Sequence, residues 1–449
     1  MDESWGTSAF VGCNMPSFPF PSGPNISCKS IGQIFDIMWS NMTETILKST
    51  LAREQIDWDM NDINLFLASL LTMGLAPEPS IEDYFKQDAR GIFGSLWMQQ
   101  RFTKQKWSFM HSHIHFDPTE CINILRTNAQ SSWNLRQVLV VDELMVTFTG
   151  KWKWIQFIKG KPHNTGLKFF GLTDDSFYLW DFWLYQGSES NRSGKPAEIV
   201  LDFMKTVETN GGAKPHVVVA DSYYGSLKLA KKLHELKYGF LLSCKSDRPV
   251  FLFSGYLHNG LIKGEFSFIH NRNFAAMTYY DKAKVNLITN LFNTCQQTVN
   301  STNTKKLPLG IYYYRKWLGG LDHFDRWLHL YLFNHRNIKW TEALLNTLLK
   351  IAVNNTHIIA TYLGFETNLK QTILELIDHL SQSTTLRNDE NRPTYQKKKT
   401  GQGHFPNEIS KSKGCVLCQS NGRKSNTSYE CDICKVPLHP KCFKEYHQK

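Results

Sequence analysis

The chain lacks the long apolar runs that cross membranes and the features that direct proteins to secretion. No stretch of about 18 apolar residues occurs, so we expect no membrane span. Its first 30 residues lack the charged start and apolar core of a signal peptide. We find no Ser-His-Asp or Cys-His grouping and no internal repeat. These absences argue against a membrane protein, a secreted protein and an enzyme with a side-chain nucleophile.

Acidic residues are fewer than basic ones, with 40 Asp and Glu against 51 Lys and Arg, and the net charge is +11. A basic chain favours an acidic partner, and nucleic acid is the commonest of these. Hydrophobic residues at 41% and aromatic residues at 13% are typical of a globular protein. The 449 residues suit roughly two to four domains.

Cysteine is scarce until the C-terminal end. Five of the 10 cysteines are scattered singly through the first 300 residues, and residues 415–449 hold the other five. Scattered thiols without a secretory signal indicate a reducing compartment, in which a cysteine cluster suggests metal rather than disulfides.

The C-terminal cysteines and histidines form three pairs with the spacing of zinc knuckles: Cys415 with Cys418, Cys431 with Cys434, and His439 with Cys442. A two-residue gap lets both side chains of a pair reach one tetrahedral Zn²⁺. His404 and His447 flank the pairs and would complete two four-coordinate sites. If the pairs alternate, the first ion has the ligands Cys415, Cys418, His439 and Cys442. The second then has Cys431, Cys434, His404 and His447. Such interleaving would stabilise a segment too short to build its own core.

The composition and hydrophobic pattern of the remaining sequence change along the chain and suggest domain boundaries. We expect a flexible arm at 1–30, a helical domain at 31–130, an α/β domain at 131–383, a basic linker at 384–403 and the cysteine-rich segment at 404–449. Within the α/β domain, strand-like runs occur at 137–141, 145–149, 167–173, 177–185, 216–220 and 239–243, with helices at 196–209, 225–236, 320–334 and 340–362. Residues 247–308 are β-rich and aromatic, show no obvious helix, and resemble an insertion. The alternation predicts a mixed sheet.

Three aspartates lie where a metal-dependent nucleic-acid enzyme would need them. Asp142 and Asp221 each end an apolar, β-branched run, and Asp322 follows a Gly-Gly-Leu segment before a helical pattern. A carboxylate at the end of a buried strand is placed to carry chemistry. Three carboxylates can hold two Mg²⁺ ions over a phosphodiester. For any one aspartate alone, a solvated loop residue or a helix N-cap is the commoner explanation, whereas the three together favour a metal site.

Several motifs together resemble the piggyBac family of DNA transposases over roughly residues 35–449. They are Val141-Asp142-Glu143, Lys161-Pro162 with Gly166-Leu167-Lys168, Ala220-Asp221-Ser222-Tyr223-Tyr224, Gly319-Gly320-Leu321-Asp322-His323-Phe324-Asp325, Trp340, Asn354-Asn355 and the terminal Cys/His segment. The Gly319–Asp325 motif is the most specific of these. Arg326 and His439 depart from the commoner family residues, and neither departure removes a catalytic carboxylate.

The resemblance implies an α/β fold with an RNase H-like mixed-sheet catalytic core that is interrupted by the β-rich insertion 247–308. It implies an N-terminal helical domain for dimerisation and DNA binding, and a C-terminal cross-braced zinc module. The implied activity is Mg²⁺-dependent cut-and-paste transposition at TTAA targets through hairpinned transposon ends. We therefore expect a nuclear homodimer that binds double-stranded DNA.

The resemblance also assigns functions to individual residues. Asp142, Asp221 and Asp322 would bind the metal ions, with Asp325 as a further acidic residue of the site. Lys161 and Lys168 would contact DNA. Trp340 would stack on a flipped base, although a buried helix tryptophan would have the same sequence.

Two other functions stay open at this point. A domesticated descendant could keep DNA binding and the three aspartates without transposing. An adaptor whose zinc module binds proteins would explain the last 45 residues or so and leave the rest of the chain without a function. Cleavage of a labelled transposon end with Mg²⁺ distinguishes the first function from both.

Overall fold

The computed structural model comprises two compact units, Met1–Leu386 and Arg387–Lys449. It describes residues 5, 7, 12, 14–86, 94–148, 150–158, 165–187, 192–211, 214–252, 257, 260–292, 297–300, 303–319, 331, 339–382 and 405–448. Among these residues, none of the helices has both the length and the apolarity that a membrane crossing requires.

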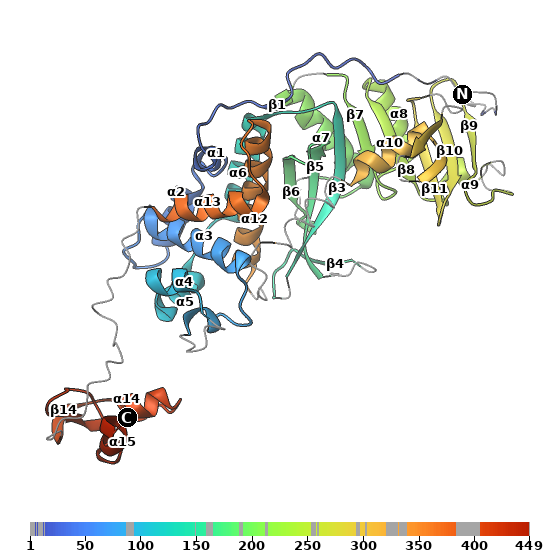
Figure 1. The fold of residues 1–449 in the computed structure, drawn as a ribbon. Coiled ribbons are helices and arrows are strands. Elements are labelled where there is room, and N and C mark those ends of the chain that lie inside the picture. The colour runs from blue at the N-terminus through green and yellow to red at the C-terminus, as the bar shows by residue number, and fades with distance from the viewer. Residues whose placement is uncertain are drawn as a thin grey trace. The chain divides into compact units, whose positions relative to one another are not determined.

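A mixed sheet forms the centre of the first unit (Figure 1). Its described strands are β3 (Val138–Thr147), β4 (Ile155–Phe157), β5 (Thr165–Asp174), β6 (Leu179–Leu184), β7 (Val217–Ala220), β8 (Gly239–Cys244), β9 (Phe266–His270), β10 (Ala275–Tyr280) and β11 (Lys284–Thr289). The order is β4-β5-β3-β7-β8-β11-β10-β9, and β6 also pairs with β5. Because β3, β7 and β8 run parallel while β5 and β6 run antiparallel to their neighbours, the RNase H-like core is confirmed.

The β-rich insertion continues this same sheet. Strand β11 pairs antiparallel with β8, and β10 and β9 follow as a meander. Two more strands, β12 (Gln297–Asn300) and β13 (Asn303–Pro308), form a separate hairpin. A single-turn helix, α9 (Pro249–Leu252), lies in the segment for which the sequence showed no helix.

Helices cover both faces of the sheet. On one face, α7 (Pro196–Gly211) and α8 (Leu227–Glu235) bury apolar side chains in the main core together with Leu139, Val141 and Val218. On the other face, α10 (Leu309–Leu318) packs against Val138, Val140 and other strand residues in a second core. Alternate residues of β3 and β7 therefore enter different cores, as the period of two in a strand requires.

A helical layer stands beside the sheet (Figure 1). Its helices are α1 (Ile31–Met38), α2 (Met42–Leu51), α3 (Met60–Leu75), α4 (Leu96–Arg101), α5 (Lys104–His113), α6 (Pro118–Ser132), α12 (Trp340–Tyr362) and α13 (Leu369–Ser381). Helix α13 packs on α3 and α1, and α12 packs on α1 and α6, so the layer is built from both ends of the unit. Asp59 caps α3 through a reciprocal capping box with Asp62.

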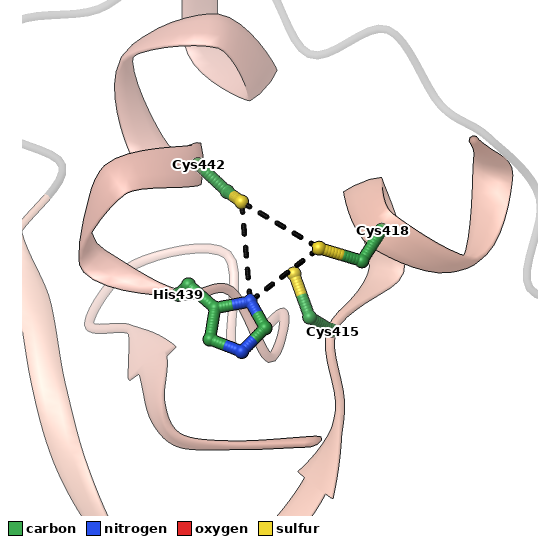
Figure 2. A group of neighbouring side chains, drawn as sticks. All are labelled: Cys415, Cys418, His439 and Cys442. Carbon is green, nitrogen blue, oxygen red and sulfur yellow. Dashed lines mark hydrogen bonds between the residues drawn. The ribbon is translucent and has the colours of Figure 1, made fainter. Parts of the chain in front are cut away.

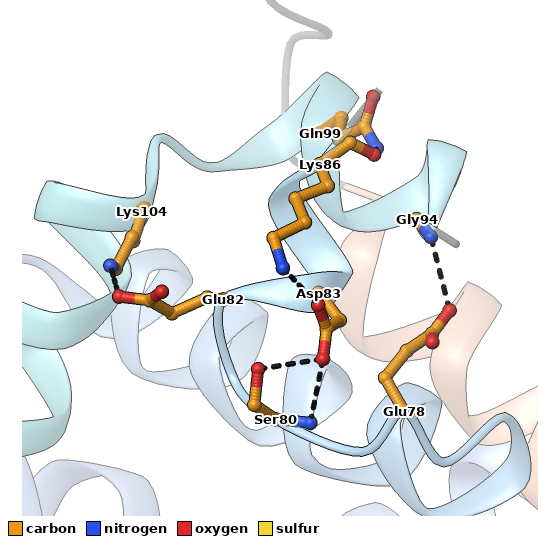
Figure 3. A network of polar contacts seen from close by, with 8 residues as sticks. All are labelled: Glu78, Ser80, Glu82, Asp83, Lys86, Gly94, Gln99 and Lys104. Atoms are coloured by element: carbon orange, nitrogen blue, oxygen red, sulfur yellow. Dashed lines mark hydrogen bonds and ion pairs between the residues drawn. The ribbon is translucent and has the colours of Figure 1, made fainter. Parts of the chain in front are cut away.

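A network of polar contacts ties the segment after α3 to α4 and α5 (Figure 3). Asp83 accepts from Ser80 and pairs with Lys86, while Glu78 accepts from the backbone of Gly94 at 3.1 Å. The side chain of Gln99 donates to the carbonyl of Lys86 at 3.0 Å, and Glu82 pairs with Lys104. These contacts give a segment without a long helix a defined path across the layer.

The described part of the N-terminal arm lies against the sheet domain. Strand β1 (Gly23–Pro24) pairs with β2 (Trp133–Asn134), and the ring of Phe18 packs on His216 with centroids 5.1 Å apart. His216 is fully buried immediately before β7, and its Nδ1 lies 3.0 Å from the carbonyl of Arg136.

The second unit is small and has little apolar core. It contains β14 (Pro406–Gly414), α14 (Val416–Ser420), β15 (Asn426–Cys431) and α15 (Phe443–Gln448). Three of the six buried residues in its core are cysteines: Cys415, Leu417, Cys431, Leu438, Cys442 and Phe443. A unit of this size needs a further source of stability, which bound metal can supply.

Candidate metal centres

The first candidate centre is the pair Asp142 and Asp221. Strands β3 and β7 run parallel with Val141 opposite Ala220, so the next residues along the two strands are the two aspartates. In-register residues on adjacent parallel strands have Cα atoms about 4.8 Å apart. Both side chains are partly exposed. Two carboxylates therefore meet at one edge of the parallel pair.

Backbone hydrogen bonds orient both carboxylates. Asp142 Oδ1 accepts from the N–H of Glu143 at 2.7 Å, and Asp221 Oδ1 accepts from the N–H of Tyr223 at 2.9 Å. The turn after β7 is closed by the N–H of Gly225, which donates to the carbonyl of Asp221 at 3.0 Å. A Cβ on Gly225 would lie 1.7 Å from the carbonyl oxygen of Ser243, so only glycine fits where this turn meets β8.

Asp142 does not end a strand, contrary to the sequence expectation of separate strands at 137–141 and 145–149. Strand β3 runs unbroken to Thr147, because β5 continues to pair with it from Leu139 to Thr147. What ends beside Asp142 is the pairing with β7, which stops at Ala220. The carboxylate is thus exposed by the shorter neighbouring strand.

Helix α10 supplies a residue that sequence reasoning missed. Tyr314 is buried in the second core, on the sheet face covered by α10. Burial raises the pKa of its hydroxyl, a hydrogen bond with Ser243 acts in the opposite direction, and the nearby charges of Asp221 and Asp142 raise it further. The hydroxyl therefore stays protonated beside the carboxylate pair. The signal that could have found this helix is the three-residue spacing of Ile311, Tyr314 and Trp317.

Asp322 and Asp325 lie outside the described residues, as do Lys161 and His404. Asp322 follows α10 by four residues along the chain, since the helix ends at Leu318.

Lys168 is described and is buried, with 8% of its surface exposed. Its Nζ lies 2.5 Å from Glu143 Oε2 and over the rings of Phe170 and Tyr223, at 4.6 and 4.8 Å from their centroids. Its charge is therefore already matched inside the protein.

Trp340 begins α12 and is partly buried. Its ring stacks on Trp152, with centroids 4.5 Å apart and planes 15° from parallel, and meets Phe116 edge-on at 5.9 Å. The structure thus places it in an aromatic cluster with part of its surface exposed.

The second candidate centre is in the C-terminal unit, where Cys415, Cys418, His439 and Cys442 converge (Figure 2). Cys418 Sγ lies 3.9 Å from Cys442 Sγ and 3.5 Å from His439 Nδ1. Four ligands around tetrahedral zinc with Zn–S bonds near 2.3 Å have sulfur atoms about 3.8 Å apart. The spacing of these side chains therefore fits one zinc ion.

Hydrogen bonds prepare this group for metal. His439 Nε2 lies 2.9 Å from the carbonyl of Asn426, which fixes the proton on Nε2 and leaves Nδ1 as the ligand atom. Burial and the neighbouring thiols raise the pKa of Cys442 to about 11. Burial also raises the pKa of Cys415, but hydrogen bonds with Cys418 and His439 outweigh it and lower that pKa to about 7. A thiol with this pKa is readily deprotonated for metal binding.

A third group consists of Cys431, Cys434 and His447. Cys434 Sγ lies 3.8 Å from His447 Nε2, and the other ring nitrogen of His447 lies 2.9 Å from the carbonyl of Phe443. The two histidines thus present opposite ring nitrogens to their groups. Because members of this group lie between those of the first in sequence, the described ligands alternate as a cross-brace. The fourth predicted ligand, His404, is not among the described residues.

Comparison with known proteins agrees with this fold. The sequence model of the family described as Transposase IS4 matches residues 32–357. Human piggyBac transposable element-derived protein 3 is 24% identical over 423 residues, which cover 86% of this chain and 70% of that protein. The human chimeric ERCC6-PGBD3 protein is also 24% identical over 423 residues, and the match covers 39% of its length.

A solved structure, the cryo-EM structure of the piggyBac transposase synaptic complex with hairpin DNA, shares the fold with a TM-score of 0.71. The match covers 94% of this chain and 98% of that chain at 18% sequence identity. The family model spans most of the chain, and the relatives and the fold agree with it. The chain therefore belongs to the transposase IS4 family and, within it, to the piggyBac transposases and their derivatives.

Proposed function

We propose that this protein is a metal-dependent DNA transposase that cleaves and joins DNA strands by phosphoryl transfer. The observation that carries the proposal is the in-register pair of Asp142 and Asp221 on adjacent parallel strands. Two oriented, partly exposed carboxylates are the hard oxygen donors that Mg²⁺ prefers.

Asp142 and Asp221 would hold the metal together with Asp322, and Asp325 would support the site. When bound, two Mg²⁺ ions would lower the pKa of the attacking water or 3′-hydroxyl and stabilise the leaving oxygen. The chain itself keeps the carboxylates in place: the pairing of β3 with β5 continues past Asp142, and the turn closed by Gly225 holds Asp221. Tyr314 of α10 is buried on the same sheet face, where the charges of Asp221 and Asp142 act on its hydroxyl.

The proposed substrate is the double-stranded DNA at transposon ends, opened through hairpin intermediates and inserted at TTAA targets in the nucleus. Support comes from the family and from the similar fold, which was solved with hairpin DNA. Trp340 would stack on an unpaired base with one side of its ring, while Trp152 supports the other. Two ends must be processed together, so we propose a homodimer.

The zinc module would bind the transposon ends. In residues 405–448, seven Lys and Arg residues oppose four Asp and Glu residues, and all seven basic side chains are exposed. Two zinc ions, each held by one alternating ligand set, would make this basic surface rigid. Phosphate contacts of this kind give strong, salt-dependent affinity.

The test is an excision assay with the genomic DNA that flanks the coding sequence cloned into a donor plasmid. The purified full chain with Mg²⁺ should release the flanked segment and leave TTAA at each break. Intact donor DNA, from a chain that binds both flanks, would contradict the transposase assignment.

That second outcome would favour the alternative, a domesticated DNA-binding protein without transposition. The observation that supports this alternative is the name of the human relative, a transposable element-derived protein. Finding no inverted repeats beside the coding sequence would favour it as well.

A further inference from the structure

A single buried cation connects the two segments that carry the carboxylate pair. Lys168 lies opposite Met145 in the pairing of β3 with β5, so its side chain is on the same face of the sheet as Met145 and Glu143. Asp142, between them, faces the opposite side, because successive residues of a strand alternate. The ammonium group of Lys168 therefore lies behind the candidate metal site and not within it.

Two of the three contacts of this ammonium group involve a residue whose backbone N–H donates to one carboxylate of the pair. Lys168 pairs with the side chain of Glu143, whose backbone N–H donates to Asp142. It also lies over the ring of Tyr223, whose backbone N–H donates to Asp221. The ion pair and the cation–π contact thus join the two donors that orient the two carboxylates.

We propose that Lys168 is a positioning residue that holds Asp142 and Asp221 in the arrangement needed to share a divalent ion, and that it acts through Glu143 and Tyr223. This inference rests on the proposed function only in that the pair binds a divalent ion. It differs from the DNA contact expected from the sequence, because the ammonium group is buried and already paired.

The two assignments of Lys168 differ in what its loss changes. A positioning residue affects metal affinity, and loss of such outer contacts typically weakens metal binding by about 10- to 100-fold. A phosphate contact affects DNA affinity, and its loss lowers the slope of log affinity against log salt by about 0.9. Metal binding without DNA, and DNA binding without metal, therefore separate them.

The experiment uses the full chain as parent, Lys168→Met, Glu143→Gln and the double variant, with exposed Lys228→Met on α8 as the matched control. Mn²⁺ binding is followed by electron paramagnetic resonance, and the carboxylate site is defined as the binding lost in Asp142→Asn. DNA affinity is measured in EDTA over a range of salt concentrations. Thermal unfolding monitors the fold of each variant.

We expect Lys168→Met to weaken Mn²⁺ binding at this site at least about tenfold, with DNA affinity and its salt slope unchanged. Lys228→Met should leave Mn²⁺ binding at the parent value. The double variant removes both charges, so it does not leave the Glu143 carboxylate without its ion pair to Lys168. Its Mn²⁺ affinity should be as low as that of Lys168→Met, because the two residues act through one contact.

Parental Mn²⁺ affinity in a folded Lys168→Met or double variant would overturn the positioning assignment. If the slope of log DNA affinity against log salt falls by about 0.9 while Mn²⁺ affinity stays parental, Lys168 is a DNA contact instead. A parent chain without any Mn²⁺ binding that depends on Asp142 would overturn the proposed function as well as this inference.

Discussion

Two neighbouring asparagines on α12, Asn354 and Asn355, should respond very differently to the same substitution. Asn355 is fully buried, accepts from the backbone N–H of Leu179 at 3.1 Å and donates to the carbonyl of Leu179 at 2.9 Å. Asn354 is also buried, with 3% of its surface exposed, and its amide has no hydrogen-bond partner among the described residues. The first joins α12 to the edge strand β6, and the second adds no hydrogen bond there.

The loss of folding free energy in each variant depends on which buried polar groups the substitution leaves without a hydrogen bond. Asn355→Ala leaves two backbone groups of Leu179 buried without partners, and each costs about 1–3 kcal/mol, or about 4 kcal/mol together. Asn354→Ala removes a similar volume but also removes an unpaired amide, so its net cost should be small. The unfolding entropy of the 386-residue first unit is about 0.8 kcal/mol/K. The Tm of Asn355→Ala should therefore lie about 5 °C below that of Asn354→Ala.

The assay is thermal unfolding of the full chain, followed by a signal from the tryptophans of the first unit. Because both variants are truncated to alanine on the same helix, the difference between their Tm values reports the hydrogen bonds of Asn355, chiefly those to Leu179. Equal Tm values for the two variants would refute the reasoning, since the loss at Asn355 would then be only a loss of packing.

Three further predictions concern the zinc module, acid stability and the turn after β7. Cys418→Ser should lose the zinc ion of the Cys415 group, and Cys434→Ser should lose the zinc ion of the Cys431 group. Native mass spectrometry should therefore find less zinc in each variant than in the parent. Parental zinc content in both variants would count against the cross-brace. Burial lowers the pKa of His216 to about 4, from about 6.5 in the unfolded chain, so stability should fall by about 3 kcal/mol as pH drops through this window. His216→Asn should flatten the pH dependence of Tm, and an unchanged profile would assign the acid sensitivity to other groups. Gly225→Ala should disrupt Mg²⁺-dependent cleavage and spare DNA binding, because its Cβ would collide with Ser243; parental cleavage would show that the turn can move freely.

The sequence predicted the proximity of Asp142 and Asp221 because each follows a run of β-branched residues, and such runs form buried parallel strands. It could not predict the exposure of Asp142 in mid-strand. That exposure depends on the length of β7, a neighbour distant in the chain. The alternating zinc ligands could be read from local spacing, whereas the ring nitrogen that each histidine presents depends on distant carbonyl groups.

The burial of Lys168 on one face of the sheet could not be predicted from the sequence for a different reason. Every residue of β5 after Thr165 is buried, so its sequence shows no alternation that would reveal which face a side chain occupies. A lysine in such a strand looks like a surface residue until its partner Glu143 is located. Helix α10 was missed because it is short and its apolar positions are largely aromatic, a pattern that also suits a strand.

The central claim, that Asp142 and Asp221 bind the metal that cleaves DNA, is tested most directly by single-turnover cleavage of end-labelled flanking DNA. Asp142→Asn and Asp221→Asn preserve the size of the side chain and remove one negative charge each. We expect the Mg²⁺-dependent cleavage rate to fall by at least about 10³-fold in both variants, with DNA affinity in EDTA unchanged. Cleavage at the parental rate by either variant would contradict the account.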